Sequence, residues 1–240
     1  MHRDPLIVSA HQPTFLPYVG IWRRFYQSDV FDLCPFDQFV SGGDYYVHRV
    51  KVGTDDNCDW LSVPLDKSHN KYNGRGIPID KVMLSQDSAA WDKFHAQIKQ
   101  VYGKYPLYDT VLPHLDFSIR TNLSDFNIRL FKSIRDYLDL STPIGVSSVP
   151  KGDDTNERVL YTIKQYRPDI YISGNIGRKY INKDKWEEQG IGVFYLDEFF
   201  YDNSLIENMK TVSILSILFT YPIDVIKTKI LDDINDPEEE

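Results

Sequence analysis

Cysteine is scarce in this chain, and the motifs of several common enzyme classes are missing. The 240 residues contain two cysteines, Cys34 and Cys58, which have no CxxC spacing and no paired histidine cluster. A disulfide framework and a zinc site are therefore not expected. GxGxxG, GxxxxGK[ST], GxSxG, HExxH and EF-hand patterns are also absent, which excludes a standard dinucleotide loop, a P-loop and the common hydrolase, metalloprotease and calcium sites. The sequence identifies no cofactor and no metal ligand.

Long apolar runs and an excess of positive charge are missing too. The most apolar late segment, residues 212–219, is far shorter than the roughly 20 residues that span a bilayer, so it predicts a core helix and not a membrane span. The amino terminus has no signal-peptide pattern, and we expect a cytoplasmic protein. The net charge of −8 makes non-specific attraction to nucleic acid weak over the whole surface.

What the chain does contain is an alternation of strand-like and helical patterns. Apolar runs predict strands at residues 6–8, 30–33, 59–64, 169–173 and 192–196. Helical spacing predicts helices at 89–102, 124–138 and 155–166, the last of them opened by the capping residues 154–157. The alternation predicts an α/β fold: one domain over residues 1–231 with a Rossmann-like, mostly parallel sheet flanked by helices, followed by an acidic, disordered tail at 232–240.

The most informative segment is residues 8–25, where His11 and Gln12 follow an apolar run and precede a helix. Pro13 and Pro17 forbid a helix across the turn between them. In an open α/β sheet, ligands bind at such a strand-to-helix corner. A second interpretation stays open, in which the two side chains only hydrogen-bond the free carbonyls of the proline-rich turn.

A second pattern lies at residues 45–52, where apolar and polar residues alternate as on a half-exposed strand or hairpin arm. Arg49 and Lys51 would share one face about 7 Å apart, a spacing that suits a phosphate or carboxylate, and His48 would lie on the other face. The alternative is an ordinary solvated strand face. Basic residues also cluster at Arg23 and Arg24, another place that could hold phosphate.

Two further predicted strand ends carry small residues. Ser173 and Gly174 end the strand at 169–173, and Arg178 follows in a turn where glycine lets backbone amides approach an anion. Ser147 follows a short apolar segment at 143–146, where its hydroxyl would bind a phosphate or sugar or would only cap the structure. A turn that simply connects strand and helix would look similar.

Taken together, these segments resemble the WbqC-like family. The blocks that carry the resemblance are HQPTFLPYVG at 11–20, HRVK at 48–51, WLSVP at 60–64, YISG at 171–174 and LSIL at 215–218. The first block is the specific one, and the order of the blocks covers nearly the whole chain. The sequence departs from the family pattern at Tyr18, where tryptophan is usual, at His48, and at the turn 175–179, so the acceptor of a relative should not be carried over.

The resemblance implies a role in building bacterial surface polysaccharide (O-antigen or capsule), with transfer of an aminoacyl or similar group to an activated amino sugar. On that interpretation the substrate is a small molecule or a nucleotide-linked sugar, His11 is the general base and Gln12 orients the acceptor. Substrate would be bound by Tyr18, His48, Arg49, Lys51, Ser147, Ser173, Gly174 and Arg178.

Two alternatives remain open. One is amino acid transfer to an activated base in phage-type DNA hypermodification, the single hypothesis in which nucleic acid is a partner. The other is a non-catalytic module that binds a nucleotide-sugar. Under all three hypotheses we expect the ligand at the strand ends that carry His11 and Gln12, Trp60 to Pro64, Ser147, and Ser173 with Gly174.

Overall fold

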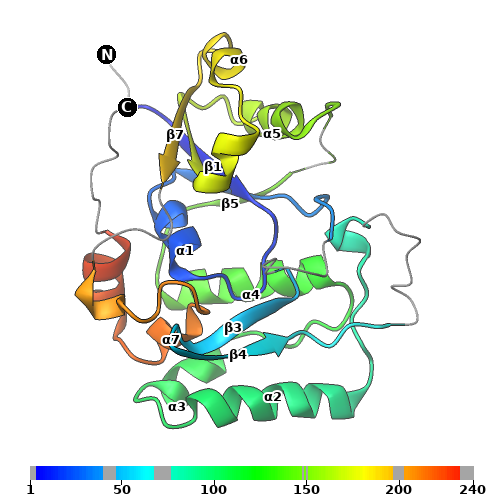
Figure 1. Ribbon diagram of the computed structural model, residues 1–240, viewed down its shortest axis with the longest axis vertical. Helices are drawn as coiled ribbons and strands as arrows, with labels where there is room; N and C mark the ends of the chain where they lie inside the picture. Colours follow the sequence, from blue (N-terminus) through cyan, green and yellow to red (C-terminus); the bar gives the residue numbers. More distant parts are fainter. Residues whose placement is uncertain are drawn as a thin grey trace.

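Five parallel strands form the central sheet of the protein (Figure 1). The computed structural model describes residues 4–39, 47–67, 77–147, 149, 151–196 and 203–232. The strands are β1 (Ile7–His11), β2 (Val30–Leu33), β5 (Ile144–Val146), β6 (Ile170–Gly174) and β7 (Gly192–Leu196). They lie in the order β5-β2-β1-β6-β7, which is the order of a doubly wound Rossmann-like fold. The predicted α/β architecture, a single domain with a parallel sheet, is confirmed.

The first strand lies at the centre of this sheet. Ser9 of β1 is in register with Phe31 of β2 on one side and with Ile172 of β6 on the other, and both pairings are parallel. The chain therefore places β2 and then β5 on one side of β1, crosses over the sheet, and places β6 and then β7 on the other side. Such a reversal leaves a crevice at the carboxyl ends of the two middle strands.

Helices cover both faces of the sheet. α1 (Val19–Tyr26) and α4 (Leu123–Tyr137) lie on one face, and α5 (Thr155–Lys164) and α6 (Lys183–Glu187) lie on the other (Figure 1). On the first face, Trp22 stacks on Phe131 at 4.1 Å between ring centroids, and Phe31 of β2 stacks on Phe131 at 5.7 Å. On the second face, Tyr171 of β6 stacks on Trp186 of α6 at 4.7 Å. Alternation of side chains along each strand supplies both cores.

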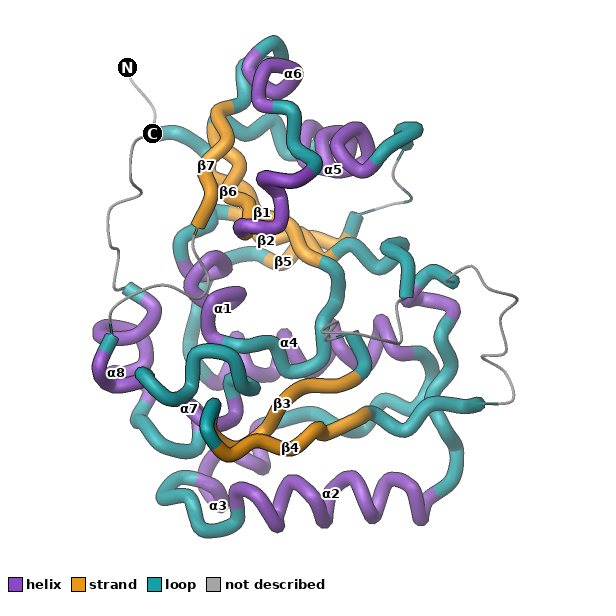
Figure 2. The backbone as a smooth tube through the Cα atoms, viewed as in Figure 1, coloured by secondary structure: helices purple, strands orange, loops and turns teal. Residues whose placement is uncertain are grey.

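A long insertion between β2 and β5 forms a second layer beyond α4 (Figure 2). It contains the hairpin β3 (Arg49–Thr54) and β4 (Asn57–Ser62), the helices α2 (Ser88–Tyr102) and α3 (Tyr108–Val111), and the short 3-10 turns η1 (Ile79–Lys81) and η2 (Leu112–His114). The strand predicted over the described part of 45–52 is β3, and residues 40–46 lie outside the described residues.

The expectation that Trp60 to Pro64 ends a strand at the ligand edge of the sheet is wrong. Trp60 lies in β4, which pairs antiparallel with β3 in a separate two-stranded sheet. The two strands are joined by a tight turn. Gly53 has a φ of +103°, and a Cβ at this position would lie 2.5 Å from the Asn57 carbonyl oxygen, so glycine is required there. A tight turn joins antiparallel strands only, which separates this hairpin from the parallel sheet.

The carboxyl-terminal segment is buried against the insertion. It contains η4 (Ser204–Ile206), α7 (Leu215–Leu218), α8 (Ile223–Val225) and the π-helical segment η5 (Ile226–Leu231). Ser216 donates a hydrogen bond to the Gly53 carbonyl at 2.6 Å, and its hydroxyl lies 2.9 Å from the Tyr102 hydroxyl. The apolar run at 212–219 is therefore core, although its helix is a single turn. In the described part of the chain, no helix is long and apolar enough to cross a membrane. Residues 233–240 of the predicted tail lie outside the described residues.

Polar side chains fix where the long helices begin. Asp87 accepts a hydrogen bond from Ala89 N at the start of α2, Asn122 from Asp125 N at the start of α4, and Asp154 from Glu157 N at the start of α5. Each cap satisfies a backbone amide that has no partner inside the helix. The predicted cap at 154–157 is confirmed, and it places the first turn of α5 beside the strand ends.

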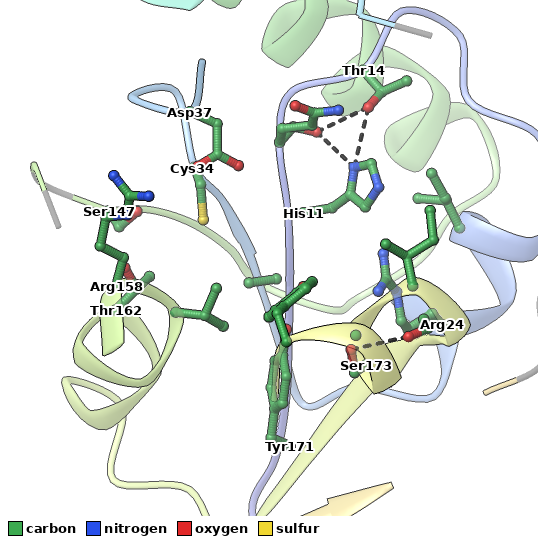
Figure 3. A pocket seen from close by; sticks show the side chains of 18 of the residues that line it. His11, Thr14, Arg24, Cys34, Asp37, Ser147, Arg158, Thr162, Tyr171 and Ser173 are labelled. Atoms are coloured by element: carbon green, nitrogen blue, oxygen red, sulfur yellow. Dashed lines mark hydrogen bonds between the residues drawn. The ribbon is translucent and has the colours of Figure 1, made fainter. Parts of the chain in front are cut away.

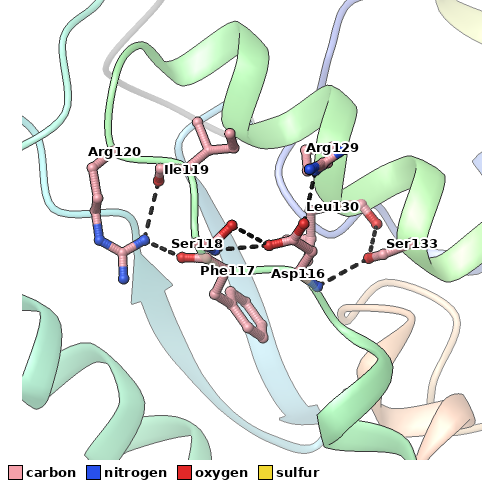
Figure 4. Close-up of polar contacts among 8 residues, drawn as sticks. All are labelled: Asp116, Phe117, Ser118, Ile119, Arg120, Arg129, Leu130 and Ser133. Atoms are coloured by element: carbon pink, nitrogen blue, oxygen red, sulfur yellow. Dashed lines mark hydrogen bonds and ion pairs between the residues drawn. The ribbon is translucent and has the colours of Figure 1, made fainter.

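The segment before α4 is tied to that helix by a polar cluster (Figure 4). Asp116 accepts hydrogen bonds from Arg129 Nε at 2.7 Å and from the Ser118 amide at 3.0 Å, and its own amide donates to Ser133 Oγ at 3.2 Å. The two Ser118 hydrogen bonds, followed by Arg129, hold the pKa of Asp116 below its ordinary value. Arg120 lies over the Trp91 ring at 3.6 Å, which connects the same segment to α2.

We expect Trp22→Ala to lower the free energy of unfolding by about 3–5 kcal/mol, because it removes a fully buried ring and its stack on Phe131. Urea unfolding at pH 7 measures the change. Phe194→Ala is the matched control: Phe194 is 44% exposed on β7, and the expected loss is about 1 kcal/mol or less. Equal losses in the two variants would contradict the central role of the α1 and α4 face.

Candidate functional site

A cavity of about 600 Å³ opens at the carboxyl ends of β1, β2 and β6 (Figure 3). This is the point where the strand order reverses, and its volume is in the range of small-molecule sites. The strand ends contribute Ala10, His11, Cys34, Ser173 and Gly174. The other lining residues are Gln12, Thr14, Tyr18, Ile21, Arg24, Phe36, Asp37, Lys51, Ser147, Arg158, Val159, Thr162, Tyr171, Ile176, Gly177, Tyr180 and Thr211.

The imidazole of His11 is oriented by its own loop. His11 Nδ1 lies 2.8 Å from the Gln12 carbonyl oxygen and 3.1 Å from Thr14 Oγ1, and Thr14 Oγ1 donates to the same carbonyl at 3.1 Å (Figure 3). A carbonyl only accepts hydrogen bonds, so the short contact assigns the proton to Nδ1. The lone pair of the neutral ring is then on Nε2, which is the nitrogen that can accept a proton.

The proline-rich turn after His11 is held from the insertion. Asn127 of α4 donates to the Pro13 carbonyl at 2.8 Å and to the Val47 carbonyl at 2.7 Å, and its side chain is buried. Leu16 has a φ of +43°, an unfavourable backbone conformation for leucine, and is 1% exposed. Buried packing and the Asn127 hydrogen bonds stabilise this turn, so the position of His11 depends on α4.

The turn after β6 is packed closely. η3 (Asn175–Lys179) begins directly after the strand, and a Cβ on Gly177 would lie 2.0 Å from Ser173 Oγ. Gly177 is therefore the glycine whose lack of a side chain makes room for Ser173. Gly174 lines the cavity with a φ of −74°, an ordinary extended conformation. Ser173 Oγ donates to the Gly174 carbonyl at 3.1 Å.

A buried carboxylate lies beneath one end of the cavity. Asp32 of β2 is 0% exposed, and it accepts hydrogen bonds from the Tyr166 hydroxyl and, at 3.3 Å, from Cys34 Sγ. A Cβ on Gly145 would lie 2.0 Å from the Tyr166 hydroxyl, so the glycine in β5 gives this pair its space. Burial, together with the charges of Asp32 and Asp37, raises the pKa of the Cys34 thiol well above its ordinary value. The cavity therefore presents a neutral thiol and not a thiolate nucleophile.

Asp37 is a carboxylic acid of the cavity that titrates close to neutral pH. Asp37 is an exposed residue, but the protein atoms packed around its carboxyl partly desolvate it and raise the pKa of Asp37 from 3.8 to about 6; the charge of Arg158 lowers this pKa, and that of Asp32 raises it. A carboxyl with a pKa near the working pH is suited to accept and donate protons.

Positive charge dominates the cavity wall. Arg24, Lys51 and Arg158 line it, against a single acidic residue, Asp37, among the described lining residues. The whole chain has a net charge of −8, so this local excess is opposite in sign to the protein as a whole. A cavity of this kind attracts an anionic ligand. In the described residues, no group of three or more His, Cys, Asp or Glu side chains could hold a metal ion.

The structure brings seven of the predicted site residues together and leaves three outside. The seven that line the cavity are His11, Gln12, Tyr18, Lys51, Ser147, Ser173 and Gly174. Arg49 and Lys51 do share a face of β3, but Arg49 stacks on Trp60 at 4.2 Å and does not line the cavity. Arg178 stacks on Tyr195 at 4.5 Å, also outside it. His48 packs against Phe39, and burial, followed by the charge of Arg49, lowers its pKa.

The polar lining residues that sequence reasoning missed include Arg24, Cys34, Asp37 and Arg158. Arg24 was noted only as part of a basic pair, yet it is 3% exposed and lines the cavity. Cys34 follows β2 directly and Asp37 lies in the loop after it, so the strand-end rule that identified His11 points to this segment as well. Arg158 lies in the first turns of α5, and no signal in the sequence marks it.

We expect the stability of the protein to fall as pH rises from about 4 to 6, through the contribution of Asp37. Its pKa is higher in the folded than in the unfolded chain, so the folded state binds the proton more tightly in this window. Asp37→Asn removes the effect, and its Tm relative to the wild type should rise between pH 4 and pH 7 in thermal unfolding scans. The control is Asp59→Asn at an exposed position of β4, and its difference in Tm from the wild type should be the same at pH 4 and at pH 7. A constant difference for Asp37→Asn would contradict the assignment.

Comparison with known proteins gives a family but no activity. The model of the WbqC-like protein family matches residues 12–228. The uncharacterized protein Rv1507c of Mycobacterium tuberculosis is 26% identical over 201 residues, which is 79% of this chain and 81% of that protein. Among solved structures there is no significant match. Because the family model extends from Gln12, beside the histidine of the cavity, to the last helical segment, the chain belongs to the WbqC-like protein family.

Proposed function

We propose that this protein is a group-transfer enzyme that moves an aminoacyl or similar group to an activated amino sugar, in bacterial surface polysaccharide biosynthesis. The observation that carries the proposal is an oriented histidine at the switch point of the sheet, in a cavity with three cationic side chains. This arrangement combines a proton acceptor with groups that hold anionic oxygens. Both are needed when an amine or hydroxyl attacks a substrate that carries phosphate.

His11 is the general base in this scheme. The Gln12 carbonyl and the Thr14 hydroxyl fix the protonated Nδ1, so that Nε2 takes the proton from the attacking amine or hydroxyl. A base that is already oriented avoids the cost of ordering it during the reaction. Gln12, whose side chain reaches the cavity, orients the acceptor through its amide.

Arg24 and Lys51 bind the anionic oxygens of the substrate. Arg24 comes from α1 and is buried, whereas Lys51 comes from β3 of the insertion, so the two cations reach the cavity from two layers of the protein. Positive groups that are already in place stabilise negative charge that develops on phosphate oxygens. The apolar parts of Tyr18 and Ile21 complete a wall for an uncharged ring.

The function is tested by incubating the protein with nucleotide-linked amino sugars, a mixture of amino acids and a nucleoside triphosphate that activates the carboxylate, and by measuring the mass of the sugar product. A product whose mass equals the sum of sugar and amino acid less one water supports the proposal. Tight binding of nucleotide-sugar with no turnover would instead indicate a binding module. Turnover only with a modified DNA base would move the acceptor to DNA.

We expect His11→Ala to abolish turnover and to change the free energy of unfolding by about 1 kcal/mol or less, since His11 Nδ1 hydrogen-bonds within its own loop. Product formation and urea unfolding measure the two effects. The control is His114→Ala, because His114 is exposed in η2, away from the cavity lining. Full activity in His11→Ala, or a loss of several kcal/mol in stability, would assign His11 a structural role.

We expect Lys51→Gln to weaken the binding of a nucleotide-sugar about tenfold and to reduce the salt dependence of binding, because one charge-assisted contact is lost. Arg49→Gln should have a smaller effect, since Arg49 stacks on Trp60 outside the cavity. Calorimetric titration at two salt concentrations measures both variants, with Lys93→Gln on exposed α2 as the control. If Arg49→Gln has the larger effect, the anion lies on the hairpin surface and not in the cavity.

A further inference from the structure

Asp37 and Arg158 face the same cavity with opposite charges, yet they do not pair with each other. Both side chains line the cavity, and the Arg158 charge lowers the pKa of Asp37. Among the described residues, however, neither side chain forms an ion pair within 4.0 Å or a side-chain hydrogen bond. Figure 3 shows both side chains on the same side of the cavity, together with Cys34 and Ser147.

The Ser147 hydroxyl is a third group without a protein partner at this end. Ser147 is 4% exposed, lines the cavity, and has no partner for its Oγ at hydrogen-bonding geometry among the described residues. It lies close enough to Cys34 to lower the pKa of that thiol, but the thiol donates its proton to Asp32. A buried hydroxyl without a partner is costly, and a ligand that hydrogen-bonds it removes the cost.

Resting on the proposed function, we infer that this end of the cavity binds an α-amino acid as the free zwitterion. The ammonium group lies against Asp37, the carboxylate against Arg158, and the Ser147 hydroxyl donates to a carboxylate oxygen. An α-amino acid carries its two opposite charges on one carbon, so it can satisfy two protein charges that are close but not in contact. Hydrogen bonds between charged groups are among the stronger ones in proteins.

Ligands with one charge fit this end less well. A primary amine would leave Arg158 without a partner, and a phosphate would lie beside the Asp37 carboxylate. Since Asp37 is the single acidic residue among the described lining residues, it is the counter-charge that the cavity offers to an ammonium group. Arg24 and Lys51 also line the cavity, and they are the cations that can bind the anionic oxygens of a phosphate-bearing substrate.

The inference narrows the chemistry of the substrate. The amino acid enters with its carboxylate free, so it has not been esterified or amidated before it binds. An aminoacyl group activated beforehand as a thioester or an ester lacks the carboxylate charge that Arg158 would bind. If the acyl group is the one transferred, a nucleoside triphosphate activates the carboxylate after binding, and the phosphate or nucleoside monophosphate joined to the acyl carbon leaves when the amine attacks.

Binding should depend on pH through Asp37. The charged groups that act on its carboxyl are Arg158 from α5 and Asp32 from β2, and the Asp37 charge in turn raises the pKa of the Cys34 thiol and of the Tyr180 hydroxyl. With a pKa of about 6, Asp37 is mostly charged at pH 7.5 and mostly neutral at pH 5. The ammonium group of an amino acid stays charged throughout this range. The affinity of the wild type for the amino acid should therefore fall between pH 7.5 and pH 5, whereas the affinity of Asp37→Asn should not change.

Calorimetric titration of the full chain with each of the twenty proteinogenic amino acids at pH 7.5 tests the inference. At least one should bind with a Kd of about 1 mM or lower, and its amide and its N-acetyl derivative should each bind about tenfold or more weakly. Asp37→Asn and Arg158→Gln should each weaken the binding of the amino acid to a similar extent. Arg158→Gln should also remove the preference for the acid over the amide, which a merely structural role would not do.

Asp59→Asn and Arg167→Gln are the matched controls, since both residues are exposed and do not line the cavity. Three results would overturn the inference: no amino acid with a Kd below about 10 mM, an amide or N-acetyl derivative that binds as tightly as the acid, or an unchanged acid preference in Arg158→Gln. His11→Ala should bind the amino acid normally. Binding without turnover would therefore overturn the proposed function alone, and turnover without amino acid binding would overturn this inference alone.

Discussion

The pairing of β1 with two parallel neighbours is the constraint on which the site depends. Val8 of β1 is in register with Val30 on one side and with Tyr171 on the other, and the Ser9 hydroxyl donates to the Ile172 carbonyl at 2.7 Å. Because β1 is central, the segment that follows its carboxyl end leads to α1 on one face of the sheet, and the segment that follows β5 leads to α5 on the opposite face. The crevice between these connections becomes the cavity, and His11 lies in it because it is the last residue of β1.

The insertion between β2 and β5 makes this crevice rigid on one side. Asn127 of α4 holds the carbonyl of Pro13 and that of Val47, so one side chain joins the turn after β1 to the segment before β3. Lys51, two residues into β3, then reaches the cavity from the insertion. The hairpin therefore contributes to the site without joining the main sheet. The positions of His11, the proposed base, and of Lys51, a proposed anion-binding cation, both depend on the buried side-chain amide of Asn127.

The sequence was sufficient to predict β1, β2, β6 and β7 because each of them is a short apolar run. It was not sufficient for Trp60, because an antiparallel hairpin strand and a strand of the main sheet have similar local composition. Arg49 was predicted from strand alternation and Arg178 from a turn after a strand, whereas their stacking on Trp60 and Tyr195 depends on contacts between different elements. Arg158 could not be predicted, since only the packing of α5 against the sheet brings it to the cavity.

The same topology explains how charge is distributed inside the cavity. α1 connects β1 to β2, α5 connects β5 to β6, and the two helices cover opposite faces of the sheet. Each helix contributes one guanidinium to the cavity: Arg24 from α1 and Arg158 from α5. Asp37 follows β2 and is influenced by Arg158. The cavity wall thus combines guanidinium groups from both faces of the sheet with the carboxyl of Asp37. A doubly wound sheet produces this arrangement without any charge motif in the sequence, because the crossover at β1 places the two helices on different faces.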